Sequence, residues 1–172
     1  ERIEFEYPKS PIMLPGNNIL KVPEKNQLEN AAKLINDSKK PVILAGHGIL
    51  LSGASQEVIK LAEVASIPVT WTLLGSGGVP ASHPLNMGMM GMHGEYAVNN
   101  AIQEADLLIA CGMRFDDRVT GDVKTYSLDS KKIHIDIDSS EINKIIPVDV
   151  GIVCDLKNTI SQLLPYIKKR QN

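Results

Sequence analysis

The chain has 172 residues, the size of one ordinary domain, and 43% of them are hydrophobic, which is enough to build a core. Its 18 basic and 20 acidic residues give a net charge of −2, and only 4% are aromatic, so nucleic acid is not expected as a partner. No apolar run approaches the roughly 18 residues that span a bilayer, so we expect no membrane partner. The charged start, Glu1 to Glu4, is unlike a secretory signal and indicates a cytoplasmic protein, with a bacterial source assumed.

Prolines mark the beginning of the sequence. Four of them fall within residues 1–24, and proline fixes φ and removes an amide donor, which disfavours regular structure. Residues 1–24 are therefore predicted to be an interdomain linker and residues 25–172 a single domain. Because the first residue is not methionine, we expect the sequence to be part of a longer protein. The domain is predicted to open with an amphipathic helix over 27–38, where apolar residues recur at helical spacing.

Beyond residue 40, short apolar runs alternate with amphipathic segments. Strands are predicted at 42–45, 67–72, 106–111, 132–137 and 150–154. Further helices are predicted at 55–65, 96–105 and 156–167, and 84–94 is predicted to be a loop rich in glycine and methionine. This alternation is typical of an α/β fold, in which a mostly parallel sheet lies between two layers of helices. Cys111 and Cys154 fall at strand positions, so both are expected to be buried thiols.

Glycine-rich or charged segments follow the predicted strands. They are Gly46-His47-Gly48, Thr72 to Gly78, Gly112 to Arg118, Asp136-Ile137-Asp138 and Asp155-Leu156, together with the loop Gly88 to Gly94. In an open parallel sheet, ligands bind outside the carboxyl ends of the strands. Glycine lets the backbone approach a ligand closely, and amides near helix starts suit phosphate. The sequence therefore predicts a binding site at this edge of the sheet.

Each of these segments also has an ordinary structural explanation. Gly46-His47-Gly48 is most often only a turn. The charged residues Arg114, Asp116, Asp117 and Arg118 can form a solvated ion-pair cluster, and methionines can fill a core as well as pack against a flat ring. There is no Gly-x-Gly-x-x-Gly fingerprint, and Gly75-Ser76-Gly77-Gly78 precedes Val79-Pro80, so it is not a P-loop. The histidines lack metal-ligand spacing, and no serine elbow or acid–base pair stands out. We therefore predict no metal ligand and no catalytic residue in this chain.

Three segments carry a family resemblance: Gly91-Met92-His93-Gly94, Arg114 to Gly121 (RFDDRVTG) and His134 to Asp138 (HIDID). Over essentially its whole length the chain resembles the central domain of the thiamin-diphosphate-dependent acetolactate synthases. Met92-His93 together with Gly112 to Gly121 distinguishes this family from the pyruvate decarboxylases. Glyoxylate carboligase, which also holds FAD, is the nearest alternative. The resemblance implies a three-layer, Rossmann-like domain with a six-stranded sheet and FAD lying across the strand ends.

The resemblance implies FAD contacts along six stretches of the sequence. The flavin and its ribityl chain would meet Met90, Gly91, Met92, His93, Gly112, Met113, Arg114, Phe115 and Asp116, with Thr72 and Leu73 alongside. The pyrophosphate would meet Gly46, His47 and Gly48. The adenosine end would meet Asp136, Ile137, Asp155 and Leu156. Positions that line the substrate channel and the inhibitor site of the family correspond to Met92, Asp117 and Arg118.

Elementary chemistry agrees with part of this assignment. An acidic residue that follows a strand, such as Asp136, can bond a ribose hydroxyl. Arg114 can pair with phosphate or carbonyl oxygens. The family usually has three glycines where this chain has Gly46-His47-Gly48, so the side chain of His47 is expected to narrow the approach to the cofactor.

The resemblance also implies a function for the full protein. It would be a transferase that joins two pyruvates, or pyruvate and 2-oxobutyrate, with loss of CO₂ in branched-chain amino-acid biosynthesis. Thiamin diphosphate and Mg²⁺ would be held by neighbouring domains, and FAD would be mainly structural, so this chain alone is expected to be inactive. Its partners would be those domains, further copies of the enzyme and a regulatory small subunit. The alternatives are the central domain of a related carboligase or oxidase, and an empty structural module with a degenerate flavin site.

Overall fold

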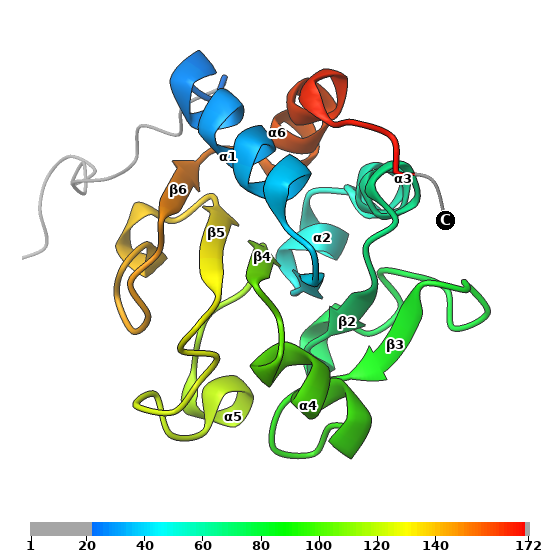
Figure 1. The fold of residues 1–172 in the computed structure, drawn as a ribbon, viewed down its shortest axis with the longest axis vertical. Helices are drawn as coiled ribbons and strands as arrows, with labels where there is room; N and C mark the ends of the chain where they lie inside the picture. The colour runs from blue at the N-terminus through cyan, green and yellow to red at the C-terminus, as the bar shows by residue number, and fades with distance from the viewer. Residues whose placement is uncertain (1–21, 171–172) are drawn as a thin grey trace, which may run out of the picture.

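Six strands form a single sheet in the computed structural model, which describes residues 22–170 (Figure 1). The strands are β1 (Pro41–Ala45), β2 (Val69–Trp71), β3 (Asn86–Met89), β4 (Leu107–Cys111), β5 (Lys131–Asp136) and β6 (Val150–Val153). Every neighbouring pair is parallel, so the sheet is parallel throughout and not merely for the most part. The predicted α/β class with a six-stranded sheet is confirmed.

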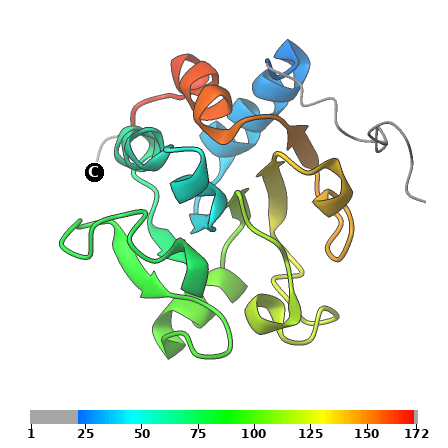
Figure 2. The same ribbon diagram turned by 180° about the vertical axis from the view of Figure 1, so that it is seen from behind.

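Helices cover both faces of this sheet and make the fold three layers deep. They are α1 (Lys25–Asp37), α2 (Gly48–Leu51), α3 (Ser55–Ala65), α4 (Tyr96–Gln103), α5 (Asp117–Thr120) and α6 (Leu156–Leu163). Short 3₁₀ turns occupy Leu73–Gly75, Ser139–Glu141 and Leu164–Tyr166. Helices α1, α2, α3 and α6 lie on one face, and α4 and α5 lie on the other (Figures 1 and 2).

The two halves of the core lie on opposite faces of the strands. Ile43 and Ala45 of β1 pack with the larger helical layer, whereas Val42 and Leu44 pack with the layer that contains α4. Strands buried on both faces have no polar face, which explains the continuous apolar run at 42–45.

Both cysteines are buried and neither forms a disulfide, and burial raises the pKa of Cys111 to about 12.

The strand order β3-β2-β1-β4-β5-β6 reverses direction between β1 and β4. From β1 the chain adds two strands on one side, and then crosses over to add three on the other. Ala45 pairs with Cys111, so β1 and β4 end at the same level. Open parallel sheets bind ligands in the crevice at such a reversal. The two loops that leave β1 and β4 therefore diverge where a ligand site is expected.

The predicted loop at 84–94 is wrong over part of its length, because it contains the edge strand β3. The segment from Asn86 to Met89 has no β-branched or aromatic residue, so its composition carries no strand signal. Contacts with β2 provide the order instead. Trp71 Nε1 donates to Asn86 Oδ1 (3.2 Å), and Thr70 Oγ1 donates to the carbonyl oxygen of Gly88 (2.8 Å).

The remaining predicted elements agree with the structure apart from their ends. The strand predicted at 67–72 is shorter, and the short helices α2 and α5 were not predicted. The predicted linker, 1–24, lies almost entirely outside the described residues, and α1 begins at Lys25. Within residues 22–170, no helix is both long enough and apolar enough to cross a bilayer.

A buried lysine anchors the long connection between β4 and β5. Lys132 Nζ donates to the carbonyl oxygens of Ser127 and Ser130, at 2.9 Å each. The Ser127 hydroxyl in turn donates to the carbonyl oxygen of Ile102 in α4, at 2.7 Å. These contacts tie the end of the connection nearest β5 to both β5 and α4.

Candidate functional site

A cavity of about 960 Å³ opens at the carboxyl ends of the strands, over the reversal between β1 and β4. Segments that follow all six strands contribute to its wall. The predicted cofactor contacts that line it are His47, Gly48, Thr72, Leu73, Met90, Met92, His93, Gly112, Met113, Arg114, Asp116, Asp136, Ile137, Asp155 and Leu156. Three other predicted contacts, Gly46, Gly91 and Phe115, do not line it.

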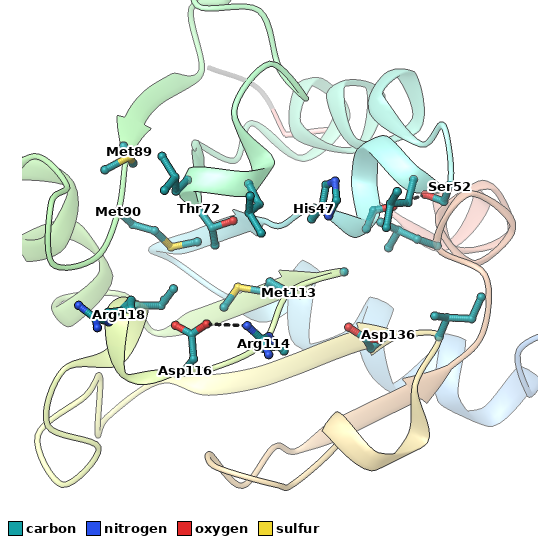
Figure 3. Close-up of a pocket in the computed structure, with 18 of the residues that line it drawn as sticks. His47, Ser52, Thr72, Met89, Met90, Met113, Arg114, Asp116, Arg118 and Asp136 are labelled. Atoms are coloured by element: carbon teal, nitrogen blue, oxygen red, sulfur yellow. Dashed lines mark hydrogen bonds and ion pairs between the residues drawn. The ribbon is translucent and has the colours of Figure 1, made fainter. Parts of the chain in front are cut away.

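The cavity is elongated, with different chemistry at its two ends (Figure 3). Met90 and Arg118 lie toward one end, and Asp136 lies toward the other. Thr72 and His47 face Met113 and Arg114 across the cavity. The site therefore offers thioether surface at one end and the Asp136 carboxylate at the other, with the Arg114–Asp116 pair and the turn at His47 between them.

Glycines allow the loops after β1 and β4 to touch. The Gly48 amide donates to the carbonyl oxygen of Gly112 (2.8 Å), and the Gly46 amide donates to that of Cys111 (2.9 Å). A Cβ atom on Gly46 would collide with the Gly112 carbonyl oxygen, and one on Gly48 would lie 2.6 Å from the Gly112 Cα. Glycine is therefore required at these positions by the opposing loop, whether or not a ligand is bound.

His47, between these glycines, has a backbone that any residue can adopt, with φ −60° and ψ −31°. Its side chain is exposed and lines the cavity. The histidine therefore does not strain the turn, and its effect is confined to the space that a ligand would enter. The expectation that it narrows this approach stays a prediction.

Gly91 is buried and connects the methionine-rich loop to two helices. Asn99 of α4 binds both backbone groups of Gly91: Oδ1 accepts from its amide and Nδ2 donates to its carbonyl oxygen, at 2.9 Å each. Gly91 has φ +95°, and a Cβ atom there would lie 2.5 Å from the Arg118 carbonyl oxygen. The Met92 amide donates to that same oxygen at 2.8 Å. Gly91 thus sets the position of Met92 and His93 from beneath the cavity.

Phe115 and Asp117 do not line the cavity, and the first is buried whereas the second is exposed. Phe115 is 3% exposed and packs edge-on against the rings of Tyr126 and His134, with centroids 6.2 and 5.2 Å apart. Asp117 is exposed and lies 3.9 Å from Arg118, the member of this pair that lines the cavity. Phe115 therefore supports the loop after β4 as a core residue.

Arg114 and Asp116 form an ion pair in the cavity wall. Arg114 Nη2 lies 3.4 Å from Asp116 Oδ2, and the two side chains are 65% and 36% exposed. A pair this exposed contributes little to stability, on the order of 1 kcal/mol or less. The second carboxylate oxygen, Asp116 Oδ1, is buried and has no hydrogen-bond partner among the described residues. This acceptor is unsatisfied, and because it is buried a ligand in the cavity cannot reach it unless the side chain moves.

A histidine that was not predicted to belong to the site lies beneath it. His134 Nε2 is 2.8 Å from the Met113 carbonyl oxygen and 3.8 Å from Asp136 Oδ2. Burial lowers the pKa of His134 below its ordinary 6.5, against the raising effects of the Met113 carbonyl and Asp136. Burial likewise raises the pKa of Asp136, while the hydrogen bond from the Asp138 amide lowers it. The imidazole is therefore neutral at pH 7.

We expect acid to destabilise the chain through His134. Because the folded pKa lies below 6.5, the unfolded chain binds the proton more readily, so the free energy of unfolding falls as pH drops below about 6.5. A single proton limits the slope to about 1.4 kcal/mol per pH unit. Urea unfolding of the wild type and of His134→Gln between pH 7.5 and 5 should show the wild type losing more stability. Parallel pH profiles for the two proteins would contradict this prediction.

Several wall residues were not predicted from the sequence. They are Leu51, Ser52, Leu74, Met89 and Val119. Leu51 and Leu74 are 75% and 61% exposed, and they add apolar surface to the cavity wall. A signal was present in the sequence, since leucine pairs stand directly after Gly46-His47-Gly48-Ile49 and after Thr72.

Among residues 22–170, no cluster of three His, Cys, Asp or Glu side chains could hold a metal ion.

Comparison with known proteins places the chain among thiamin enzymes. Residues 28–163 match the family model described as "Thiamine pyrophosphate enzyme, central domain". The chain is 50% identical over 165 residues to the probable acetolactate synthase large subunit of Methanocaldococcus jannaschii, which covers 94% of this chain and 28% of that protein. It is 47% identical over 166 residues to the acetolactate synthase large subunit of Corynebacterium glutamicum, covering 96% and 26%.

A third relative, the acetolactate synthase of Mycobacterium leprae, is 44% identical over 165 residues, which cover 96% of this chain and 26% of that protein. The chain spans less than a third of the length of these curated relatives. The family model covers most of the chain, and the parallel sheet agrees with it. The chain therefore belongs to the family of thiamine pyrophosphate enzyme central domains.

Proposed function

We propose that this chain is the FAD-binding central domain of an acetolactate synthase large subunit. The observation that carries the proposal is the elongated cavity at the strand-order reversal, with its thioether end and its carboxylate end. Parallel sheets bind dinucleotides at this position. The names of the relatives support the enzyme class, since proteins called acetolactate synthase are 44 to 50% identical to this chain.

The apolar end suits a flat aromatic ring system. Met90 and Met92 offer polarisable thioethers, and the exposed side chains of Leu73 and Leu74 add apolar surface. Exposed apolar groups that gather around a cavity favour a ligand that covers them.

The carboxylate end suits a ribose. Asp136 lies at the end of β5, and its Oδ1 accepts the Asp138 amide at 2.9 Å, which leaves Oδ2 for a hydroxyl donor. Asp155 Oδ1 caps α6 by accepting the Asn158 amide at 2.8 Å. A carboxylate held at a strand end in this way is the usual partner of a nucleotide ribose. The residues present therefore fit FAD, with the adenosine at this end.

The full protein, on this proposal, joins two 2-oxo acids with loss of CO₂, as expected for pyruvate or pyruvate and 2-oxobutyrate. Thiamin diphosphate, Mg²⁺ and the catalytic groups then belong to neighbouring domains. The 172 residues alone are without synthase activity. Neighbouring domains, further copies of the enzyme and a regulatory small subunit are the proposed partners.

FAD titration tests the proposal directly. The purified chain should quench flavin fluorescence on binding, and saturating FAD at about 100 times the dissociation constant should raise the free energy of unfolding by about 2.7 kcal/mol. Asp136→Ala should weaken binding about tenfold, because a charge-assisted hydrogen bond of about 1.5 kcal/mol is lost. Asp129→Ala is the matched control, since Asp129 is exposed and does not line the cavity.

A second candidate, an empty structural module, is favoured by one observation, the His47 side chain in the cavity wall. The module predicts no thermal shift and no quenching with FAD for the wild type. If His47→Gly then binds FAD, the histidine is the obstruction, because the backbone at this position accepts either residue. If neither protein binds, the flavin proposal for this chain fails.

A further inference from the structure

His134 lies in β5 beneath the cavity and is 1% exposed. The residues around it in the same layer, including Ala110 and Phe115, are buried and largely apolar. Its Nδ1 atom is buried and has no hydrogen-bond partner among the described residues. A buried imidazole with one unsatisfied nitrogen stabilises a core less than an apolar ring does, so packing alone does not account for a histidine at this position.

The other ring nitrogen holds the loop that follows β4. Nε2 lies 2.8 Å from the carbonyl oxygen of Met113. Because a carbonyl oxygen can only accept, Nε2 carries the hydrogen and donates it. The Phe115 ring packs edge-on against the imidazole, with centroids 5.2 Å apart. His134 therefore fixes the backbone of this loop one residue beyond Gly112, where the chain turns with φ +57°.

The same nitrogen lies beside the carboxylate at the other end of the cavity. Asp136 Oδ2 is 3.8 Å from His134 Nε2, while its Oδ1 is held by the Asp138 amide. Met113 and Asp136 both line the cavity, and Figure 3 shows them on the same side of it. One buried ring thus contacts the loop assigned to the flavin and lies next to the carboxylate assigned to the ribose.

We propose that His134 is a positioning residue for the FAD site, which holds the Met113 backbone at a fixed place relative to the end of β5 that carries Asp136, so that one ligand can meet both. It does not line the cavity itself and acts through the Met113 backbone, to which Nε2 donates. The inference rests on the proposed function, because the ligand that spans the two ends is FAD. The donor at Nε2 carries the effect, and Nδ1 carries none.

Three substitutions separate the two nitrogens. His134→Gln places an amide nitrogen near the Nε2 position and keeps the donor, whereas His134→Asn reaches only to the Nδ1 position. His134→Phe fills the same space without any donor. We expect the FAD dissociation constant to rise about tenfold in the Asn and Phe variants and to stay within about threefold of the wild type in the Gln variant. Flavin fluorescence titration measures the constants, and circular dichroism verifies folding.

A readout without FAD accompanies the titration. Hydrogen exchange of the amides in residues 112–116 should be faster in the Asn and Phe variants than in the Gln variant and the wild type. If the folded Phe variant binds FAD as tightly as the wild type, His134 is a packing residue and the inference is overturned. Stability losses without any change in the dissociation constant overturn it equally. A wild type that binds no FAD overturns the proposed function together with this inference.

Discussion

Gly112→Ala should lower the free energy of unfolding by about 3 kcal/mol or more, because the added methyl group meets both backbone strain and a steric clash. The added Cβ would lie 2.6 Å from the Cα and 3.0 Å from the carbonyl carbon of Gly48. Both are backbone atoms in a turn that is itself hydrogen-bonded to Gly112, so neither side can move freely. Overpacking costs about 1–3 kcal/mol, and a left-handed φ of +57° adds about 1–2 kcal/mol for a residue with a Cβ.

Gly53→Ala is the matched control for this substitution. Gly53 has nearly the same φ, +63°, but a Cβ there would meet no heavy atom within 4 Å. Its loss of stability should therefore be about 1–2 kcal/mol, from backbone strain alone. Urea unfolding followed by circular dichroism measures both variants. Equal losses for the two alanines would show that the loops after β1 and β4 can separate at little cost.

Asn99→Ala should destabilise the chain by about 3 kcal/mol, because its side chain bonds both backbone groups of the buried Gly91, at 2.9 Å each. The Gly91 amide would lose its partner, and an orphaned buried donor costs about 1–3 kcal/mol. The Gly91 carbonyl oxygen would keep the Gly94 amide, at 2.9 Å, but would lose its second hydrogen bond, worth about 1 kcal/mol. Since Gly91 carries Met92 and His93, FAD affinity should fall as well.

The next residue along α4 gives a control for this change. Asn100 is exposed, so Asn100→Ala removes an asparagine from the same helix without disturbing the loop. Its effect should lie within about 0.5 kcal/mol, and alanine has the better helix propensity. Chemical unfolding and FAD titration of the two variants provide the comparison. A loss below about 1 kcal/mol for Asn99→Ala would mean that water replaces both of its hydrogen bonds.

The central part of the sheet could be predicted from the sequence because burial on two faces leaves a simple pattern. Residues 42–45 and 107–111 are continuous apolar runs, and each is followed by a glycine at the point where the strand ends. Helices α1 and α3 carry apolar residues at helical spacing because only one face of each is buried. These patterns arise from local burial, which sequence periodicity records directly.

The edge of the sheet could not be predicted, because there the order comes from distant contacts. β3 is a strand because Thr70 and Trp71 bond its residues, and nothing in its own composition favours extended structure. The individual roles of the site glycines are hidden for the same reason. The sequence does not record which atoms face a glycine, so Gly46 and Gly91 are predicted as ligand contacts although neighbouring backbone requires both.

The contacts of His134 could not be predicted from the sequence either. It is a histidine within an apolar strand, yet its partners, Met113 and Asp136, belong to a loop and a strand end that meet only after folding. The residues that line the cavity are more accessible to prediction. They follow strands, and the rule that parallel sheets bind ligands at their carboxyl ends selects those positions without knowledge of the contacts.

The pairing of β1 with β4 has a consequence for the order of folding events. These two strands are separated by more of the chain than any other paired strands in the sheet, whereas all other pairings join near neighbours. Closing the longest loop carries the largest entropy loss and slows folding. We expect the two half-sheets to gain protection first in pulsed hydrogen exchange, and the Gly46 amide, which donates to the Cys111 carbonyl oxygen, to follow. The cavity would then form last. Its ligand therefore cannot assist the earlier folding steps and stabilises only the completed fold.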